Sequence, residues 1–237
     1  MKKYAVPHFS SPFSKGYLKS AASHFGNVRS MVTAALLCAV AIVLERFNLH
    51  LSDSLQVSLS FIPIMLCSAL TGPLFAIPCG IIVDVIGFVI GGYAFMPGYT
   101  LTAVLTAMSY ALFLYGSRMS LMRLAMSKLF VNVFINTVLG SVWRVYYYGH
   151  PFFFAAATSG MKNLLLFPAE VLIISVFFGA VGKPLTAMGY LSYTPEKPKL
   201  SKLDAVLLSV FALIAIAATV LLAVYYNDIK EAFKFLK

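Results

Sequence analysis

A single carboxylate, Asp84, lies near the middle of an apolar stretch, residues 74–92, that is long enough to span a membrane as a helix. An ionised aspartate at that depth costs about 2.5–3.5 kcal/mol on insertion scales, so it must face a partner, a cavity or a ligand. Gly87 and Gly91 form a G-x-x-x-G pair beside it, which lets another backbone approach closely. The combination predicts the wall of a small-molecule site, unless a neighbouring helix satisfies Asp84 in a packed bundle.

Further polar and aromatic residues lie at depths that agree with one outward-facing pocket. Asn132 and Asn136 are one helical turn apart, so they share a helix face. Three cations would stand at the mouth of this pocket, where they could bind a carboxylate. The predicted substrate-binding residues are Arg46, Asp84, Phe95, Tyr99, Thr100, Asn132, Asn136, Trp143, Arg144, Lys162 and Asn163.

These residues also have structural interpretations. Trp143 is typical of an interfacial aromatic belt. Arg144 and Lys162 are long enough to snorkel to the membrane surface. Asn132 and Asn136 could join helices by hydrogen bonds. Glu170, near the middle of its own apolar stretch, could pair with a neighbouring helix or with Asn163. Lys128 is expected to snorkel toward the inner membrane surface.

Motifs for catalysis or energy conversion are absent from the sequence. There is no G-x-x-x-x-G-K-[ST] nucleotide loop, no H-E-x-x-H or other histidine cluster, and no G-x-S-x-G elbow. Cys38, Cys67 and Cys79 lie in apolar stretches without a C-x-x-C pattern, so we predict small packing residues rather than a disulfide or a metal site. A binding or transport role fits better than an enzyme, and no cofactor is expected.

Composition indicates an integral membrane protein. Of the 237 residues, 60% are hydrophobic and 11% are charged, whereas soluble domains average about 25% charged residues. The net charge of +10 resides in short segments that flank apolar stretches. The positive-inside rule explains this distribution better than nucleic-acid binding does.

The pattern of apolar stretches predicts an all-α membrane protein with a six-helix core and a seventh helix. We expect a basic cytoplasmic segment at residues 1–29, the core at 30–184, a Pro/Lys-rich cytoplasmic linker at 185–203, and an extra transmembrane helix with a short tail at 204–237. A polar loop is expected at 45–58 and an aromatic-rich connection from Arg144 to Phe154. The core spans are predicted at residues 30–44, 59–70, 74–92, 99–115, 124–146 and 161–181.

The charges of the loops predict a multi-pass protein of the cell membrane with its N-terminus in the cytoplasm. This orientation places eleven lysines and arginines on the inner side, in segments 1–29, 116–123 and 183–203. The outer loops keep Arg46 and Arg144, with Lys162 near the boundary.

The central part of the chain resembles the folate-type substrate-binding (S) components of energy-coupling factor (ECF) vitamin transporters. The resemblance extends over about residues 33–184. It rests on Phe61-Ile62-Pro63-Ile64, Gly72-Pro73, Asp84 with Gly87, residues 95–101, and the stretches 131–143 and 162–174.

The resemblance implies a six-helix protein that captures folate from outside. It would then join a separate transmembrane coupling protein and two ATPases, which explains why this chain has no nucleotide loop. An A-x-x-x-A stripe on the first helix would contact the coupling protein, which matches Ala35 and Ala39. For the ligand we expect a pteridine edge on Asp84, stacking on aromatic rings, and a glutamate tail on Arg46, Arg144 or Lys162.

Three alternatives remain at this stage. The same machinery could carry another vitamin or precursor, such as pantothenate, a thiamine precursor or pyridoxine. A polytopic membrane enzyme would need clustered catalytic groups at one interface, which the sequence lacks. A structural membrane subunit would need no pocket, whereas the buried polar residues argue for one.

Overall fold

The computed structural model describes residues 16–52, 55–92, 95–117, 120–149 and 151–191. The predicted seventh helix and most of the predicted linker lie outside these residues. The described elements are α1 (Tyr17–Ser23), η2 (His24–Gly26), α2 (Val28–Arg46), β1 (Asn48–Ser52), β2 (Leu55–Ser58), α3 (Phe61–Thr71), α4 (Pro73–Gly91), α5 (Pro97–Leu114), α6 (Leu121–Phe130), η3 (Val131–Leu139), α7 (Gly140–Tyr148) and α8 (Phe152–Ala187).

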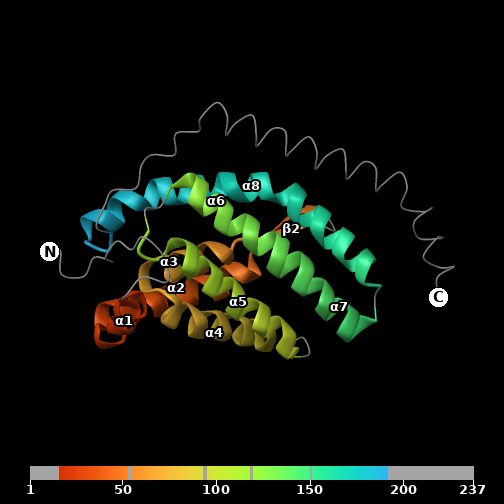
Figure 1. Ribbon diagram of the computed structural model, residues 1–237, viewed down its shortest axis with the longest axis horizontal. Coiled ribbons are helices and arrows are strands. Elements are labelled where there is room, and N and C mark those ends of the chain that lie inside the picture. Colours follow the sequence, from red (N-terminus) through yellow and green to blue (C-terminus); the bar gives the residue numbers. More distant parts are fainter. Residues whose placement is uncertain (1–15, 53–54, 93–94, 118–119, 150, 192–237) are drawn as a thin grey trace.

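The six predicted core spans are all present, and the all-helical fold class is confirmed. Within the described residues, five helices or continuous helical stretches are long and apolar enough to cross a membrane, and α3 is a shorter apolar helix. The segments α6, η3 and α7 form one span of 28 residues. In Figure 1 this span and α8 lie together on one side of the molecule, and α2 to α5 lie on the other.

Local sequence explains where several helices begin and end. Gly72 has φ +78, a left-handed value that glycine adopts without strain, and Pro73 follows at the first position of α4. The Asn27 side chain accepts a hydrogen bond from the Arg29 backbone N–H and so caps α2. Gly149, with φ +67, ends α7 shortly before Pro151.

Two connections differ from the prediction. The polar loop contains an antiparallel hairpin, in which β1 pairs with β2. We call the end of the bundle that carries this hairpin the hairpin end. The expected aromatic connection from Arg144 to Phe154 is mostly helical, because α7 continues to Tyr148 and α8 already begins at Phe152. Alanines in the first turns of α8 favour the helix, and the break is confined to the glycine and proline between the two helices.

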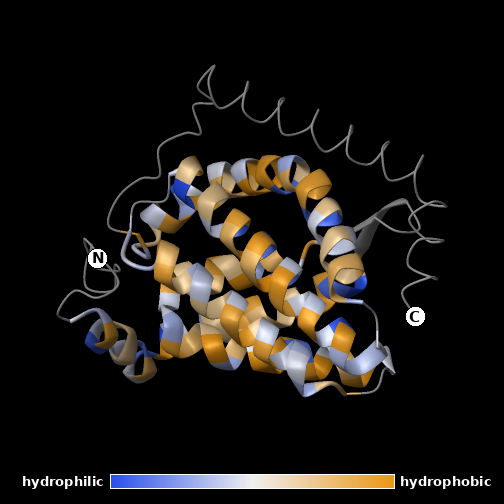
Figure 2. Ribbon diagram, turned by 45° about the vertical axis from the view of Figure 1, so that its right-hand side comes forward, coloured by the Kyte–Doolittle hydropathy of each residue, from blue (hydrophilic) through white to orange (hydrophobic). Residues whose placement is uncertain are grey.

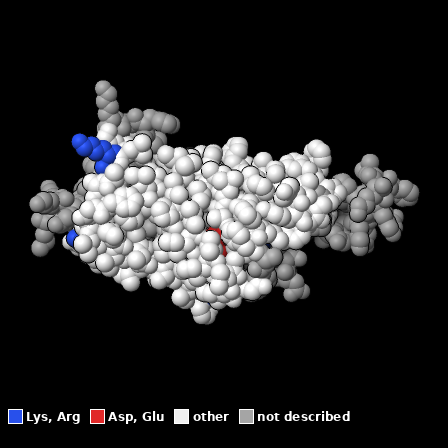
Figure 3. Space-filling model, turned by 90° about the horizontal axis from the view of Figure 1, so that it is seen from below, with Lys and Arg blue, Asp and Glu red and all other residues white. Residues whose placement is uncertain are grey.

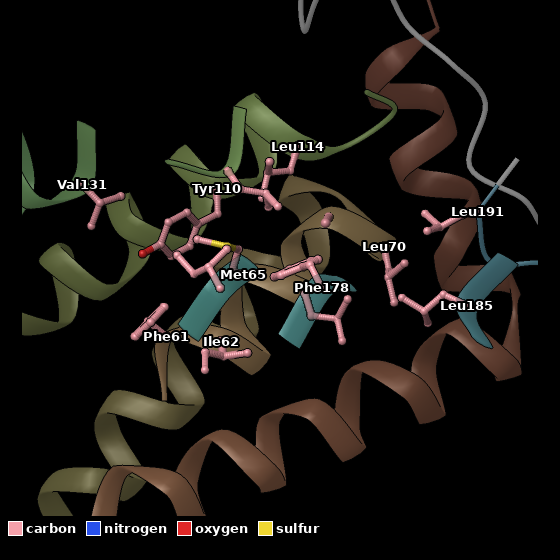
Figure 4. Close-up of a cluster of buried hydrophobic side chains, with 14 of the residues drawn as sticks. Phe61, Ile62, Met65, Leu70, Tyr110, Leu114, Val131, Phe178, Leu185 and Leu191 are labelled. Carbon is pink, nitrogen blue, oxygen red and sulfur yellow. The ribbon is translucent and has the colours of Figure 1, made fainter. Parts of the chain in front are cut away.

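The core packs mainly α3 against α5, α6 and α8. In Figure 4, Met65 of α3 lies beside Tyr110 of α5, and Phe178 of α8 lies in the same cluster. Many apolar side chains on the outer surface of the bundle are exposed, and Figure 2 shows hydrophobic residues along all the long helices. In Figure 3 the visible face has few charged side chains, which lie mainly at one end. An apolar belt of this kind is what a lipid-facing surface requires.

The prediction of three packing cysteines is wrong for one pair. Cys38 of α2 and Cys79 of α4 form a disulfide, with their Cα atoms 5.8 Å apart. Ala34, Ala41 and Val83 also line this seam, and small residues there let the two helices approach closely. Cys67 is a free, buried thiol, as predicted for a packing residue.

The segment before α2 docks on the end of the bundle opposite the hairpin. The Tyr17 hydroxyl donates to the Ala111 carbonyl oxygen at 2.9 Å. The ring of His24 is buried between the hydroxyls of Ser30, 2.9 Å from Nδ1, and Tyr115, 3.1 Å from Nε2. Burial lowers the pKa of His24. Part of the predicted basic segment is therefore an ordered cover for this end.

Candidate functional site

A cavity of about 370 Å³ opens between α3, α5, the α6–α7 span and α8. We call it the deep cavity. This volume lies within the usual range of about 300–1,000 Å³ for small-molecule sites. Its lining residues are Ser58, Ser60, Phe61, Ile64, Thr106, Tyr110, Lys128, Val131, Asn136, Arg144, Ser159, Lys162, Asn163, Leu166 and Glu170.

A buried ion pair forms part of the lining of the deep cavity. Lys128 Nζ lies 3.1 Å from Glu170 Oε1, and the two side chains are only 5% and 10% exposed. The ammonium group also lies 3.9 Å from the centre of the Phe61 ring. The prediction that Lys128 snorkels to the surface is therefore wrong, because a carboxylate on the facing helix and an aromatic ring satisfy it inside the bundle.

Asparagine side chains connect this ion pair to the wider part of the site. Asn132 Nδ2 donates to Glu170 Oε2 at 2.7 Å, and Asn136 Nδ2 donates to Asn132 Oδ1 at 3.2 Å. The Asn132 carbonyl oxygen accepts from Thr137 Oγ1 at 2.8 Å and from Asn163 Nδ2 at 3.1 Å. These contacts fall in η3, a π-helical stretch of the span. Such stretches often occur at functional sites.

Two further cations face the deep cavity from α7 and α8. Arg144 and Lys162 are both half-buried, and among the described residues neither forms an ion pair with a carboxylate. Arg144 makes one long hydrogen bond, 3.4 Å from Nη1 to Thr158 Oγ1. Together with Lys128 they set three cations against the single carboxylate of Glu170, a formal charge of +2 in the lining. The cavity therefore favours an anion.

Asp84 lies in a different polar group, between α2, α4 and α5. It accepts a hydrogen bond from Thr100 Oγ1 at 2.6 Å. The Glu45 carboxylate packs against α4 at Gly87, where a Cβ atom would lie 2.8 Å from Glu45 Oε2, and Arg46 donates to the Gly87 carbonyl oxygen. None of these residues lines the deep cavity. The sequence left open that a neighbouring helix satisfies Asp84, and Thr100 on α5 is such a partner.

Trp143 and Phe95, two aromatic residues of the predicted site, do not line the deep cavity. Trp143 Nε1 donates to Thr102 Oγ1 at 3.0 Å. A Cβ atom at Gly98 would lie 2.6 Å from the Trp143 ring, so glycine is required for this contact. Phe95 is exposed and meets Phe88 edge to face.

A second cavity, of about 340 Å³, lies at the hairpin end and shares Arg144 with the deep cavity. We call it the outer cavity. It is formed where the first turn of α5, the last turn of α7 and the first turns of α8 meet. Its lining residues are Tyr99, Arg144, Tyr148, Phe154, Ala155 and Thr158.

The predicted site residues thus divide between several places. The deep cavity collects Asn136, Arg144, Lys162 and Asn163, and the outer cavity takes Tyr99. The sequence analysis did not include Glu170 among the binding residues. One signal could have found it, because the cavity-lining positions of α8 repeat at helical spacing. They are Ser159, Lys162, Asn163, Leu166 and Glu170.

Comparison with known proteins identifies a family and individual proteins that this chain resembles. The profile of the family "ECF transporter, substrate-specific component" matches residues 29–191, more than half of the chain. A folate transporter FolT from Leuconostoc mesenteroides subsp. mesenteroides is 34% identical over 152 residues, which cover 61% of this chain and 82% of that protein. A folate transporter FolT from Clostridium novyi (strain NT) is 27% identical over 148 residues, 62% of this chain and 86% of that protein.

A solved structure agrees with these relatives. The crystal structure of FolT bound with folic acid superposes with a TM-score of 0.57 and 28% sequence identity, and the match covers 64% of this chain and 92% of that chain. The resemblance to folate-type S components is confirmed, and the family is a transport component, not an enzyme. With six apolar helices among its described residues, a cavity between them and a match over residues 29–191, the chain belongs to the substrate-specific component family of ECF transporters.

Proposed function

We propose that this protein binds folate, or a folate derivative, in the deep cavity. The observation that carries the proposal is the formal charge of +2 in its lining, where Arg144 and Lys162 have no carboxylate partner among the described residues. Folate joins a heteroaromatic pteridine to a glutamate that carries two carboxylates. Two unpaired cations match that dianion, and charge-assisted hydrogen bonds are the strongest of the polar contacts available.

The two ends of the cavity suit the two ends of the ligand. The glutamate tail lies toward Arg144 and Lys162, while the pteridine lies toward Glu170, with Tyr110 and Phe61 beside it. Both Glu170 oxygens are already hydrogen-bonded, but each carboxylate oxygen has a further lone pair for an N–H of the ring. Pairing of the pteridine with Asp84 stays a prediction, and Glu170 is the competing candidate because it lines the cavity.

The folate-loaded protein then delivers its ligand through a separate membrane coupling protein and two ATPases. The absence of a nucleotide loop from the sequence supports a division of labour between chains. Ala35 and Ala39 lie on the exposed face of α2, whereas Ala34 and Cys38 face the bundle. The small exposed pair leaves room for a partner helix to pack closely. The proposed orientation keeps the N-terminus in the cytoplasm, so the hairpin end faces outward.

Titration of the purified chain in detergent tests the proposal, with Trp143, the one tryptophan, as the fluorescent probe. We expect saturable quenching by folate and none by pantothenate or thiamine. Lys162→Gln should weaken folate binding roughly tenfold to a hundredfold, which is the loss of one charge-assisted hydrogen bond. A response to another vitamin instead would keep the transport role and refute the substrate.

The same assay distinguishes Glu170 from Asp84 as the carboxylate that binds the pteridine. Glu170→Gln should reduce folate affinity and Asp84→Asn should leave it nearly unchanged, because only Glu170 lines the deep cavity. The opposite order would assign the pteridine contact to Asp84. No response of the unmodified chain to any vitamin would refute folate capture itself.

A further inference from the structure

The outer cavity offers space that the ligand of the proposed function does not need. The deep cavity, at about 370 Å³, already contains cations for both carboxylates of a single glutamate. Beyond Arg144 lies the outer cavity, with a volume of about 340 Å³. A nearly equal volume therefore adjoins the end of the site that would bind the anionic glutamate.

The lining of the outer cavity suits a carboxylate-bearing group that is joined to the first glutamate through an amide bond. Arg144 belongs to both cavities, and its guanidinium has five N–H donors in a fork that can serve more than one carboxylate. The Thr158 hydroxyl lies 3.4 Å from Arg144 Nη1, on the outer side. Tyr99 and Tyr148 provide further hydroxyls, while Phe154 and Ala155 provide apolar wall. None of the described residues that line this cavity is acidic, so none of them repels a second anionic group.

We propose that the outer cavity binds a further γ-linked glutamyl residue, so that the protein accepts folates with an extended glutamyl tail as well as folate itself. This inference rests on the proposed function, because it assumes that the first glutamate lies at Arg144 and Lys162. Arg144 then bridges successive carboxylates, one from each cavity. Residues that line only the outer cavity determine tail length and leave recognition of the pteridine unaffected.

Neighbouring residues of α8 allow a matched test. Thr158 and Ala155 line only the outer cavity, whereas Ser159 lines only the deep one. Ala155→Leu fills the outer cavity, and Thr158→Val keeps its shape but removes the hydroxyl. Ala155 is buried, so a leucine at this position could prevent folding. Thr158→Val keeps the test valid in that case. Ser159→Ala is the control.

The measurement is the dissociation constant of folate and of pteroyl-γ-diglutamate for each variant. The unmodified protein should bind the two ligands within about threefold of each other, and Ala155→Leu should weaken the diglutamate about tenfold or more while changing folate little. Thr158→Val should shift the ratio in the same direction by a smaller factor. Ser159→Ala should change both constants by the same factor.

The possible failures are distinguishable. Tight folate binding with rejection of the diglutamate by the unmodified protein would overturn the inference and leave the proposed function intact. Diglutamate binding that Ala155→Leu and Thr158→Val weaken no more than folate binding would also overturn it, since the tail would then lie elsewhere. Failure of the unmodified protein to bind either ligand would refute both proposals.

Discussion

Replacing Lys128 by methionine removes one partner of the buried ion pair and leaves Glu170 without its cation. Breaking a buried pair in this way costs about 3–5 kcal/mol of unfolding free energy. We expect the lower end, about 3 kcal/mol, because Glu170 keeps its hydrogen bond from Asn132 and lines a cavity that can admit water. For a chain of this size that corresponds to a fall in melting temperature of roughly 6–12 °C.

A double-mutant cycle separates the interaction energy of Lys128 with Glu170 from the contacts that each residue makes with its surroundings. Glu170→Gln alone should cost a similar amount, since it strands the Lys128 ammonium. The double variant should be more stable than either single variant, because no uncompensated charge then remains. Thermal unfolding in one detergent, followed by Trp143 fluorescence, measures all four proteins.

A second lysine provides the control. Lys162 also lines the deep cavity, but it has no carboxylate partner among the described residues. Lys162→Met should therefore leave the melting temperature unchanged or raise it. Additive effects of the two single variants, within about 0.5 kcal/mol, would refute the reasoning, and so would equal destabilisation by Lys162→Met.

Two further predictions concern parts of the protein away from the cavities. Ala39→Leu on the exposed face of α2 should abolish co-purification with the proposed coupling protein, while folate titration stays unchanged. Val40→Leu on the same helix is the control. Undiminished co-purification of Ala39→Leu would exclude this stripe as the contact. Because burial lowers the pKa of His24, stability should be constant above about pH 6.5 and fall as the pH drops below it, since the unfolded chain takes up the proton first. Melting temperatures of His24→Gln across this range should lack that component, and an unchanged pH profile would refute the assignment.

Helix prediction succeeded where the signal was local. Apolar length and the Gly72-Pro73 break are properties of short segments, and the helices that they delimit end within a few residues of these signals. The start of α8 was missed because aromatic and alanine residues suit both an interfacial loop and a helix. The Cys38–Cys79 disulfide was missed because spacing along one chain does not say which helices touch.

The candidate site shows the same limit more sharply. The sequence identified Asn136, Arg144, Lys162 and Asn163 as polar residues in or beside apolar spans, and all four line the deep cavity. Polar residues in apolar stretches are readable from hydropathy. It could not rank Asp84 against Glu170. Both are carboxylates near the middle of an apolar helix, and the rotation of each helix about its axis decides which one faces the cavity.

The sequence alone therefore determined the membrane class, the six core spans and the family, since these follow from composition, local breaks and short motifs. Tertiary packing alone decided that Lys128 pairs with Glu170, that Thr100 satisfies Asp84, and that Arg144 stands between two cavities. The physical reason is that a charged group in a low-dielectric interior needs a partner, and for Lys128, Glu170 and Asp84 that partner lies on another helix. Which helix supplies that partner depends on the packing of the whole bundle.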